Sequence, residues 1–160
     1  MTKDMKRREF LALAGPGLLV IFPVPAPAAL QGRRGGPPSD VNAYLKINPD
    51  GRVTCLVGKV ELGQGSKTAL AQLLAEELDV ELDAVDMVMG DTDQCPWDGG
   101  TYGSLSVRSF GPLLRGAGAE ARAALLQMAA EKLQEPAERL SVKAGVVSGS
   151  KGKVSYAQLV

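Results

Sequence analysis

Residues 60–70 read VELGQGSKTAL and place two glycines around a glutamine, directly between a strand-like and a helix-like segment. Gly63 and Gly65 permit backbone conformations that a side chain disfavours, and their missing β-carbons let a ligand lie against the main chain. Amides at a helix N-terminus bind anions and polar groups, and the Gln64 amide both donates and accepts. Taken alone, the turn is most simply a tight strand-to-helix connection, because neither the dinucleotide fingerprint nor the phosphate-loop spacing is completed.

The segments around this turn predict an α+β fold with a small mixed or antiparallel sheet and two main helices. Alternating apolar residues and the turn NPDG predict a β-hairpin over residues 43–57, and a further alternation predicts a strand over 85–89. A helix is expected from Ser66, as its capping residue, to Leu78, and a second helix over about 106–133. Short antiparallel strands are expected over residues 140–156, around Gly145 and around Gly149 and Ser150.

Two features of the expected helices concern their packing. Leu70, Leu73, Leu74 and Leu78 form a stripe that predicts a core-facing side of the first helix. The second helix has a stripe of small residues, Ala117, Ala121, Leu125 and Met128, with Gly116 and Gly118 nearby. Small residues let two elements approach closely, so a close contact at this helix is expected.

The composition excludes several classes of function. The chain has 160 residues, enough for one domain, and its 18 basic and 18 acidic residues balance, which argues against nucleic-acid binding. It contains no histidine, which removes Ser-His and Cys-His nucleophile pairs and most catalytic zinc sites. The two cysteines, Cys55 and Cys95, fit either two small buried side chains or a single bridge.

The N-terminus has the three parts of an export signal. Arg7 and Arg8 are followed by Phe10 and Leu11, then by a mildly apolar run that ends near residue 28. Repeated prolines and glycines make this run a poor membrane span, and the paired arginines resemble a twin-arginine signal. An uncleaved anchor or a chance basic pair is the alternative. We therefore expect a signal peptide over residues 1–28, a flexible linker over 29–40 and the folded domain over 41–160.

A second candidate site lies at residues 99–106, GGTYGSLS, just ahead of the second expected helix. Thr101, Ser104 and Ser106 supply hydroxyl groups, and the glycines expose backbone amides. If both helices dock on the same edge of the sheet, these residues and the first turn face one ligand from two sides. Together the two segments indicate a bound phosphate-bearing cofactor. Trp97, just before this segment, is suited either to stacking on a ligand or to covering the core.

These segments resemble a known enzyme family. The stretches GKVELGQGSKTALAQLLAEELDV, MGDTDQCPWDGGTYGSLSVRSFGPLLRGAGAEAR and GKVSYAQLV are similar to the molybdopterin-binding subunit of the xanthine dehydrogenase and aldehyde oxidase family, of the isoquinoline oxidoreductase or nicotinate dehydrogenase type. The resemblance covers about residues 41–160, with two separated motifs in the same order and spacing. It implies that the chain is the N-terminal part of a molybdenum-cofactor-binding domain.

The resemblance also implies roles for individual residues. Gln64, with Gly63 and Gly65, is expected to contact the molybdopterin. The matching candidates in the later loop are Thr101, Gly103, Ser104 and Ser106. The family's general base is a glutamate much further along the chain, so no catalytic residue and no metal ligand is expected in this segment. Glu61, beside the turn, is expected to be a solvated or structural carboxylate rather than a base.

The implied activity is oxidation or hydroxylation of an aromatic N-heterocycle or an aldehyde, with water as the oxygen source. The implied cofactor is molybdopterin, in either its mononucleotide or its dinucleotide form, with iron-sulfur clusters on a small partner subunit and a c-type cytochrome as a further partner. Because the cofactor is assembled in the cytoplasm and twin-arginine export carries folded cargo, a periplasmic location is expected, with membrane contact only through the export signal. The alternative is an exported, non-catalytic binding or interaction domain left from a truncated enzyme.

Overall fold

A computed structural model describes residues 17–22 and 43–160 of the chain. The signal-peptide residues Arg7, Arg8, Phe10 and Leu11 and the expected linker at 29–40 lie outside the described residues. The strands are β1 (Leu18–Phe22), β2 (Ala43–Ile47), β3 (Val53–Val57), β4 (Val85–Met89), β5 (Ser141–Lys143), β6 (Val146–Gly149) and β7 (Gly152–Ser155). The α-helices are α2 (Ser66–Leu78), α3 (Gly111–Leu133) and α4 (Tyr156–Leu159), with short helical turns at Leu82–Ala84, Ser106–Phe110 and Ala137–Arg139.

The larger sheet is mixed and has the strand order β1-β2-β3-β4. The expected hairpin is confirmed, since β2 and β3 pair antiparallel with Leu45 opposite Cys55. β3 and β4 pair parallel, which requires a crossover, and α2 provides it as the helix of a βαβ unit. The edge strand β1 was not expected, because its apolar run lies within the segment assigned to the signal peptide. Cleavage of that segment remains a prediction.

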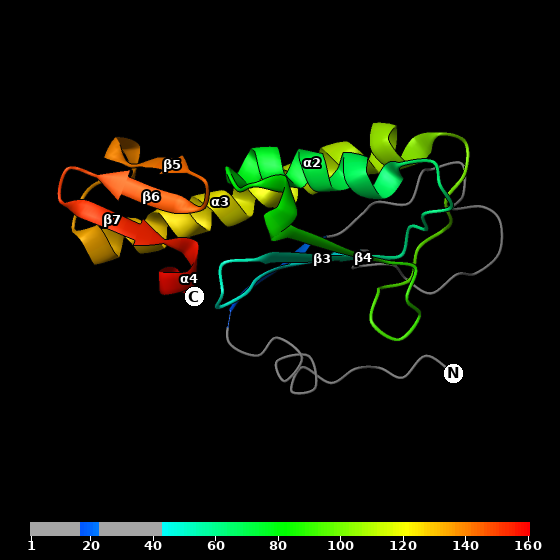
Figure 1. Cartoon of the computed structure of the whole chain (residues 1–160), viewed down its shortest axis with the longest axis horizontal. Helices are drawn as coiled ribbons and strands as arrows, with labels where there is room; N and C mark the ends of the chain where they lie inside the picture. Colours follow the sequence, from blue (N-terminus) through cyan, green and yellow to red (C-terminus); the bar gives the residue numbers. More distant parts are fainter. Residues whose placement is uncertain (1–16, 23–42) are drawn as a thin grey trace.

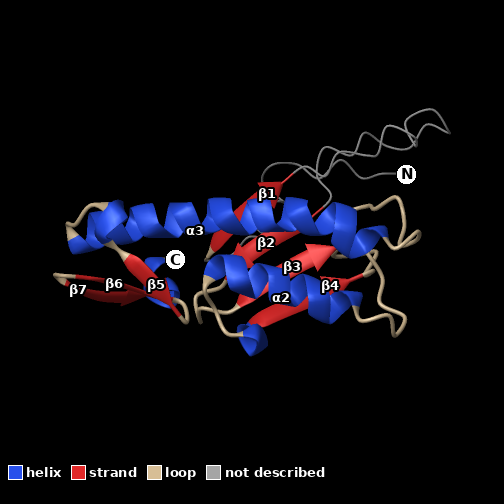
Figure 2. Cartoon of the chain, turned by 90° about the horizontal axis from the view of Figure 1, so that it is seen from above, coloured by secondary structure: helices blue, strands red, loops and turns tan. Residues whose placement is uncertain are grey.

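The two long helices lie side by side on one face of this sheet, and α3 extends beyond the sheet to β5–β7 (Figure 1 and Figure 2). The core lies between these two layers. Leu70, Leu74 and Leu78 of α2 are fully buried, which confirms the predicted stripe, and Leu73 is half-buried at its margin. Inward-facing residues of the strands, such as Val53 and Cys55, complete the core. The α+β expectation, with two main helices, is confirmed.

The small-residue stripe of α3 packs against α2. Ala117, Ala121 and Leu125 are buried, whereas Met128 is half-buried. At Gly118, an added β-carbon would lie 3.0 Å from Glu77 Cβ and 3.1 Å from Leu74 Cδ1. At Gly116, by contrast, an added β-carbon would meet nothing within 4 Å. The expected close approach therefore occurs at Gly118 and not at Gly116, because only Gly118 faces α2.

A second sheet, with the order β5-β6-β7, lies beside the C-terminal half of α3 (Figure 1). Its position is fixed by Tyr156, whose buried hydroxyl donates a 2.9 Å hydrogen bond to the carbonyl of Leu78 at the end of α2. Glu135, just after α3, accepts hydrogen bonds from the Ser150 hydroxyl and the Lys151 amide in the β6–β7 turn. These contacts attach the C-terminal strands to both long helices.

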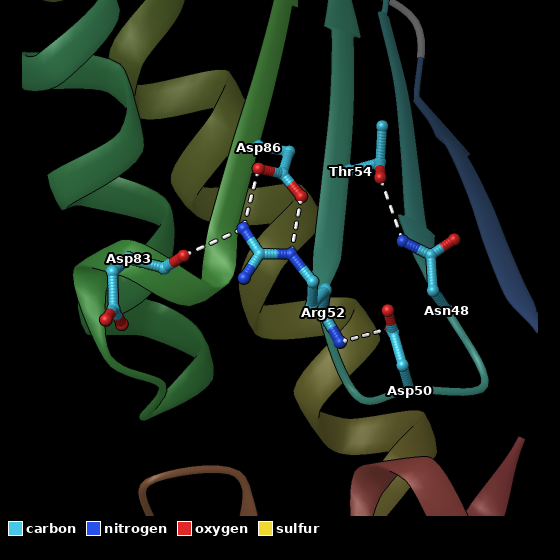
Figure 3. Close-up of polar contacts among 6 residues, drawn as sticks. All are labelled: Asn48, Asp50, Arg52, Thr54, Asp83 and Asp86. Carbon is cyan, nitrogen blue, oxygen red and sulfur yellow. Dashed lines mark hydrogen bonds and ion pairs between the residues drawn. The ribbon is translucent and has the colours of Figure 1, made fainter.

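The start of the parallel strand pair is held by Arg52 (Figure 3). Its Nε and one Nη each donate a 2.7 Å hydrogen bond to a different oxygen of Asp86 in β4, and the same Nη reaches the Asp83 carbonyl at 2.8 Å. This bidentate contact links Arg52, just before β3, to Asp86, the second residue of β4. Both side chains are more than 40 % exposed, so the ion pair sets the strand register more than it adds stability.

Candidate functional site

The parallel pairing of β3 and β4 explains why the two predicted segments lie together. In a parallel pair the carboxyl ends of both strands reach the same edge, and here Val57 pairs with Met89. After β3 the chain enters the GQG turn (residues 60–66). After β4 it enters a long connection, and the last part of this connection is the second candidate segment, called the second loop (residues 99–106). Both segments lie at the end of the molecule opposite β5–β7 (Figure 1). Crevices at the carboxyl ends of parallel strands are common ligand sites in α/β proteins.

Two contacts join the segments directly. The backbone amide of Val60, where the GQG turn begins, donates a 2.9 Å hydrogen bond to the Thr101 hydroxyl. Next to it, Lys59 Nζ donates to Asp98 Oδ1 at 2.6 Å and to the Gly100 carbonyl at 2.8 Å. The Lys59 and Asp98 side chains are only 15 % and 5 % exposed. This ion pair, largely removed from water, attaches the start of the second loop to the end of β3.

The GQG turn is organised by Glu61. Its Oε1 accepts hydrogen bonds from the amides of Gly63 at 2.7 Å and Gly65 at 2.9 Å. Its Oε2 accepts from the Ser66 hydroxyl at 2.9 Å and from the Lys67 amide at 2.8 Å. The expectation that Ser66 caps α2 is wrong, since Gly65 is the capping residue. Glycine has no side chain that could accept a hydrogen bond from the first amides of the helix. The Glu61 carboxylate takes over the capping role instead.

These hydrogen bonds perturb the titration of Glu61. They lower the pKa of its carboxyl from 4.5 to about 2, chiefly through the backbone amides of Lys67 and Gly65. Glu61 is therefore ionised at all physiological pH values and already accepts four hydrogen bonds. The expectation of a structural carboxylate rather than a base agrees with this geometry.

Gln64 lies exposed at the tip of the turn and is folded onto its own backbone. Its Oε1 accepts from the Leu62 amide at 2.6 Å, and its Nε2 donates to the Val60 carbonyl at 2.8 Å and to the Ser66 hydroxyl at 3.2 Å. Both amide protons are engaged, while Oε1 keeps one lone pair for a further donor. Gly63 and Gly65 have φ values of 98° and 79°, which favour glycine, so the turn needs both.

The second loop differs from the GQG turn because it exposes polar groups that have no hydrogen-bond partner among the described residues. Gly103 and Ser104 both have left-handed backbone angles, with φ of 65° and 56°, and both are exposed. Among the described residues, neither their amides nor the Ser104 hydroxyl has a hydrogen-bond partner. Ser106 is half-buried and begins a π-helical turn, Ser106–Phe110, that leads into α3. π-helical turns occur often at functional sites. The left-handed backbone of Ser104 is also uncommon for a residue other than glycine.

Exposed apolar side chains are concentrated at this end of the protein. Of the large hydrophobic residues that are exposed in the described part of the chain, all but Leu82 belong to the segments 60–62 and 97–107: Val60, Leu62, Trp97, Tyr102 and Val107. Trp97 is 54 % exposed, so it does not cover the core. Apolar side chains gathered around a loop cluster are typical of a surface that a ligand or another protein segment covers.

Other features of the described residues lie away from these segments. A shallow hollow of about 380 Å³ is formed by α3 and α4 and lined by Met128, Glu131, Lys132, Gln158 and Leu159. Cys55 and Cys95 are free thiols. Among the described residues no cluster of acidic or cysteine side chains is arranged to hold a metal ion. In the same residues, no helix combines the length and the apolar character needed to cross a membrane.

The structure thus places the candidate residues of the two motifs at one end of the fold. Thr101 contacts the GQG turn directly, whereas Gln64 and Ser104 share no hydrogen bond. That these residues contact a cofactor stays a prediction. The sequence reasoning missed Lys59 and Asp98, which are 39 positions apart. The capping role of Glu61 had a signal, since a carboxylate stood just before two glycines at a helix start.

Comparison with known proteins identifies the family. The model of the molybdopterin cofactor-binding domain matches residues 8–160. A nicotinate dehydrogenase subunit of Pseudomonas putida is 39 % identical over 153 residues, covering 92 % of this chain and 13 % of the relative. The beta subunit of isoquinoline 1-oxidoreductase from Brevundimonas diminuta is 34 % identical over 172 residues, covering 99 % of this chain and 22 % of the relative.

A solved structure agrees with this match. Quinoline 2-oxidoreductase from Pseudomonas putida 86 superposes with a TM-score of 0.62 at 28 % identity, over 73 % of this chain and 15 % of that one. The chain therefore spans less than a quarter of the length of each of these proteins. The match to the family model covers residues 8–160, so it includes both loops of the candidate site. By sequence and by fold, this chain belongs to the molybdopterin cofactor-binding domain family.

Proposed function

We propose that this chain forms one side of the molybdopterin site in a molybdenum hydroxylase subunit that oxidises an aromatic N-heterocycle or an aldehyde. The observation that carries the proposal is the meeting of the GQG turn and the second loop at the carboxyl edge of β3 and β4, joined by Val60 and Thr101. The relatives' names support the substrate class, since they include a nicotinate dehydrogenase and an isoquinoline oxidoreductase.

The residues present fit such a group. A pterin carries several hydrogen-bonding ring atoms and a phosphate, and it needs donors and acceptors at close range. The free amides of Gly103 and Ser104 and the Ser104 hydroxyl are donors, and the spare lone pair of Gln64 Oε1 is an acceptor. The exposed side chains of Trp97 and Tyr102 offer apolar faces beside the loop.

When bound, the molybdenum cofactor supplies the redox chemistry that transfers oxygen from water to the substrate. The described residues contribute binding and orientation. Lys59 and Asp98 fix the position of the second loop, while Glu61 fixes the GQG turn. The general base and the remaining walls of the site belong to other parts of the full-length protein. We therefore expect this segment to be inactive by itself.

The proposal extends to assembly and location. A small iron-sulfur subunit accepts electrons from the cofactor, with a c-type cytochrome as a further carrier, and the cofactor is the mononucleotide or the dinucleotide form of molybdopterin. Arg7 and Arg8 direct the loaded protein to the periplasm by the twin-arginine route. In a fusion of residues 1–40 to a folded reporter, changing both arginines to lysine should abolish export. Unchanged export would contradict this part of the proposal.

The cofactor site is tested by Gln64→Ala in the longer subunit, expressed with its partners. The measurement is molybdenum per protein by mass spectrometry, together with the pterin released on denaturation. Gln72→Ala is the matched control, because Gln72 is an exposed glutamine on α2 away from the turn. We expect molybdenum content to fall in Gln64→Ala and to stay normal in the control. Normal loading of both variants would count against the assigned role of Gln64.

The second candidate function, an exported non-catalytic binding domain, is favoured only by the exposed apolar residues around the two loops. Sequencing the gene downstream of Val160 separates the two. A frame that continues with further cofactor-binding segments supports the molybdenum hydroxylase, whereas a stop codon supports the binding domain.

A further inference from the structure

The N-terminus of α2 has the chemistry of an anion site, but the chain fills it itself. Free amides at the start of a helix and the positive end of its dipole favour a negative charge. Here the amides of Gly63, Gly65 and Lys67 and the hydroxyl of Ser66 all point at the Glu61 carboxylate, at 2.7 to 2.9 Å. A carboxylate offers about four lone-pair sites, so Glu61 is saturated.

We propose that Glu61 is a positioning residue that serves as the built-in anion of the GQG turn, holding its shape and closing the α2 N-terminus to phosphate and other external anions. An incoming phosphate would have to displace a covalently tethered carboxylate that already makes four hydrogen bonds. The tether makes this exchange unfavourable, because the internal group loses little freedom on binding whereas a free anion loses much.

This arrangement assigns different tasks to the two loops. The GQG turn presents Gln64, a neutral amide whose acceptor oxygen has one free lone pair. The second loop presents the unpaired amides of Gly103 and Ser104. Resting on the proposed function, the inference is that the GQG turn meets a neutral hydrogen-bonding edge of the ligand, while the ligand's anionic group binds elsewhere. The low pKa of Glu61 agrees with this, since the carboxylate stays charged inside the turn.

The test uses the isotope-labelled 160-residue chain without molybdenum, so its failure leaves the proposed cofactor function untouched. Amide signals of Gly63, Gly65 and Lys67 are followed by NMR while inorganic phosphate is added. In the wild type these signals should not move. In Glu61→Ala they should shift saturably with phosphate, and formate should move them back toward their wild-type positions by replacing the lost carboxylate. Glu120→Ala, which removes an exposed acid of α3, should behave as the wild type.

A second measurement keeps the inference testable if Glu61→Ala does not fold. In the wild type, the Glu61 side-chain carboxyl carbon is followed from about pH 6 to about pH 3, a range in which an ordinary glutamate titrates. It should stay close to the chemical shift of the ionised form over this range. Phosphate-induced shifts of the three amides in the wild type would overturn the inference. So would an ordinary titration of Glu61, or a folded Glu61→Ala variant that responds to neither anion.

Discussion

The Lys59–Asp98 ion pair offers a quantitative test of how the candidate site is held. Lys59→Met keeps the aliphatic stem but removes Nζ, which lies 5.9 Å from the centroid of the Phe110 ring, and leaves Asp98 with only the Gly100 amide as a partner. Removing one member of a buried pair costs about 3–5 kcal/mol, because the other charge stays buried without compensation. Lys59 is still 15 % exposed and Asp98 5 %, so we expect the lower end, about 3 kcal/mol.

The assay is urea unfolding followed by circular dichroism, with Asp98→Asn and the double variant measured alongside. Each single change should lower the free energy of unfolding by about 3 kcal/mol, and the double variant should lose much less than the sum. Arg115→Met is the control, since Arg115 pairs with Glu77 at the surface and is 50 % exposed, and it should cost less than about 1 kcal/mol. Additive losses, or single losses as small as that of the control, would refute the reasoning.

Three further predictions concern packing and pH. Gly116→Ala should raise the free energy of unfolding by about 0.8 kcal/mol, because alanine has the higher helix propensity. Gly118→Ala should lower it by about 1 kcal/mol, because the added β-carbon meets α2. Equal effects of the two substitutions in urea unfolding would contradict the packing. Leu125→Ala, at a fully buried position, should cost about 2–5 kcal/mol by the same assay, and a loss below about 1 kcal/mol would be inconsistent with its burial. Because the pKa of Glu61 is lowered in the folded state, its stabilisation is complete above about pH 4.5 and is lost as the pH falls toward about 2. The difference in melting temperature between the wild type and Glu61→Gln should therefore shrink over that range, and a constant difference would argue against the assignment.

The sequence predicted the elements whose signal is local. The alternating apolar residues on both sides of the turn at residues 48–51 predicted the β2–β3 hairpin. The leucine stripe predicted α2 with its observed bounds. Both patterns show which face of the element is buried. β1 was missed since an apolar run among prolines near the N-terminus fits an export signal equally well. The sequence pattern therefore did not distinguish the two.

The same distinction applies to the candidate site. The two glycine-rich motifs were visible as sequence, and the family match is confirmed. The contacts that hold them together were not visible, because Lys59 and Asp98 become neighbours only through the parallel pairing of β3 and β4. Glu61 caps α2 because two left-handed glycines, Gly63 and Gly65, turn the chain so that its amides face the Glu61 carboxylate. Residue spacing alone does not give this geometry.

In the proposed function, the GQG turn and the second loop form part of a molybdopterin site. The most direct test is metal and pterin analysis of the longer subunit, purified with its partners from the native host. We expect molybdenum and released pterin in amounts equal to the protein, both reduced when Gln64 is replaced by alanine. A fully folded subunit that contains neither molybdenum nor pterin would contradict it.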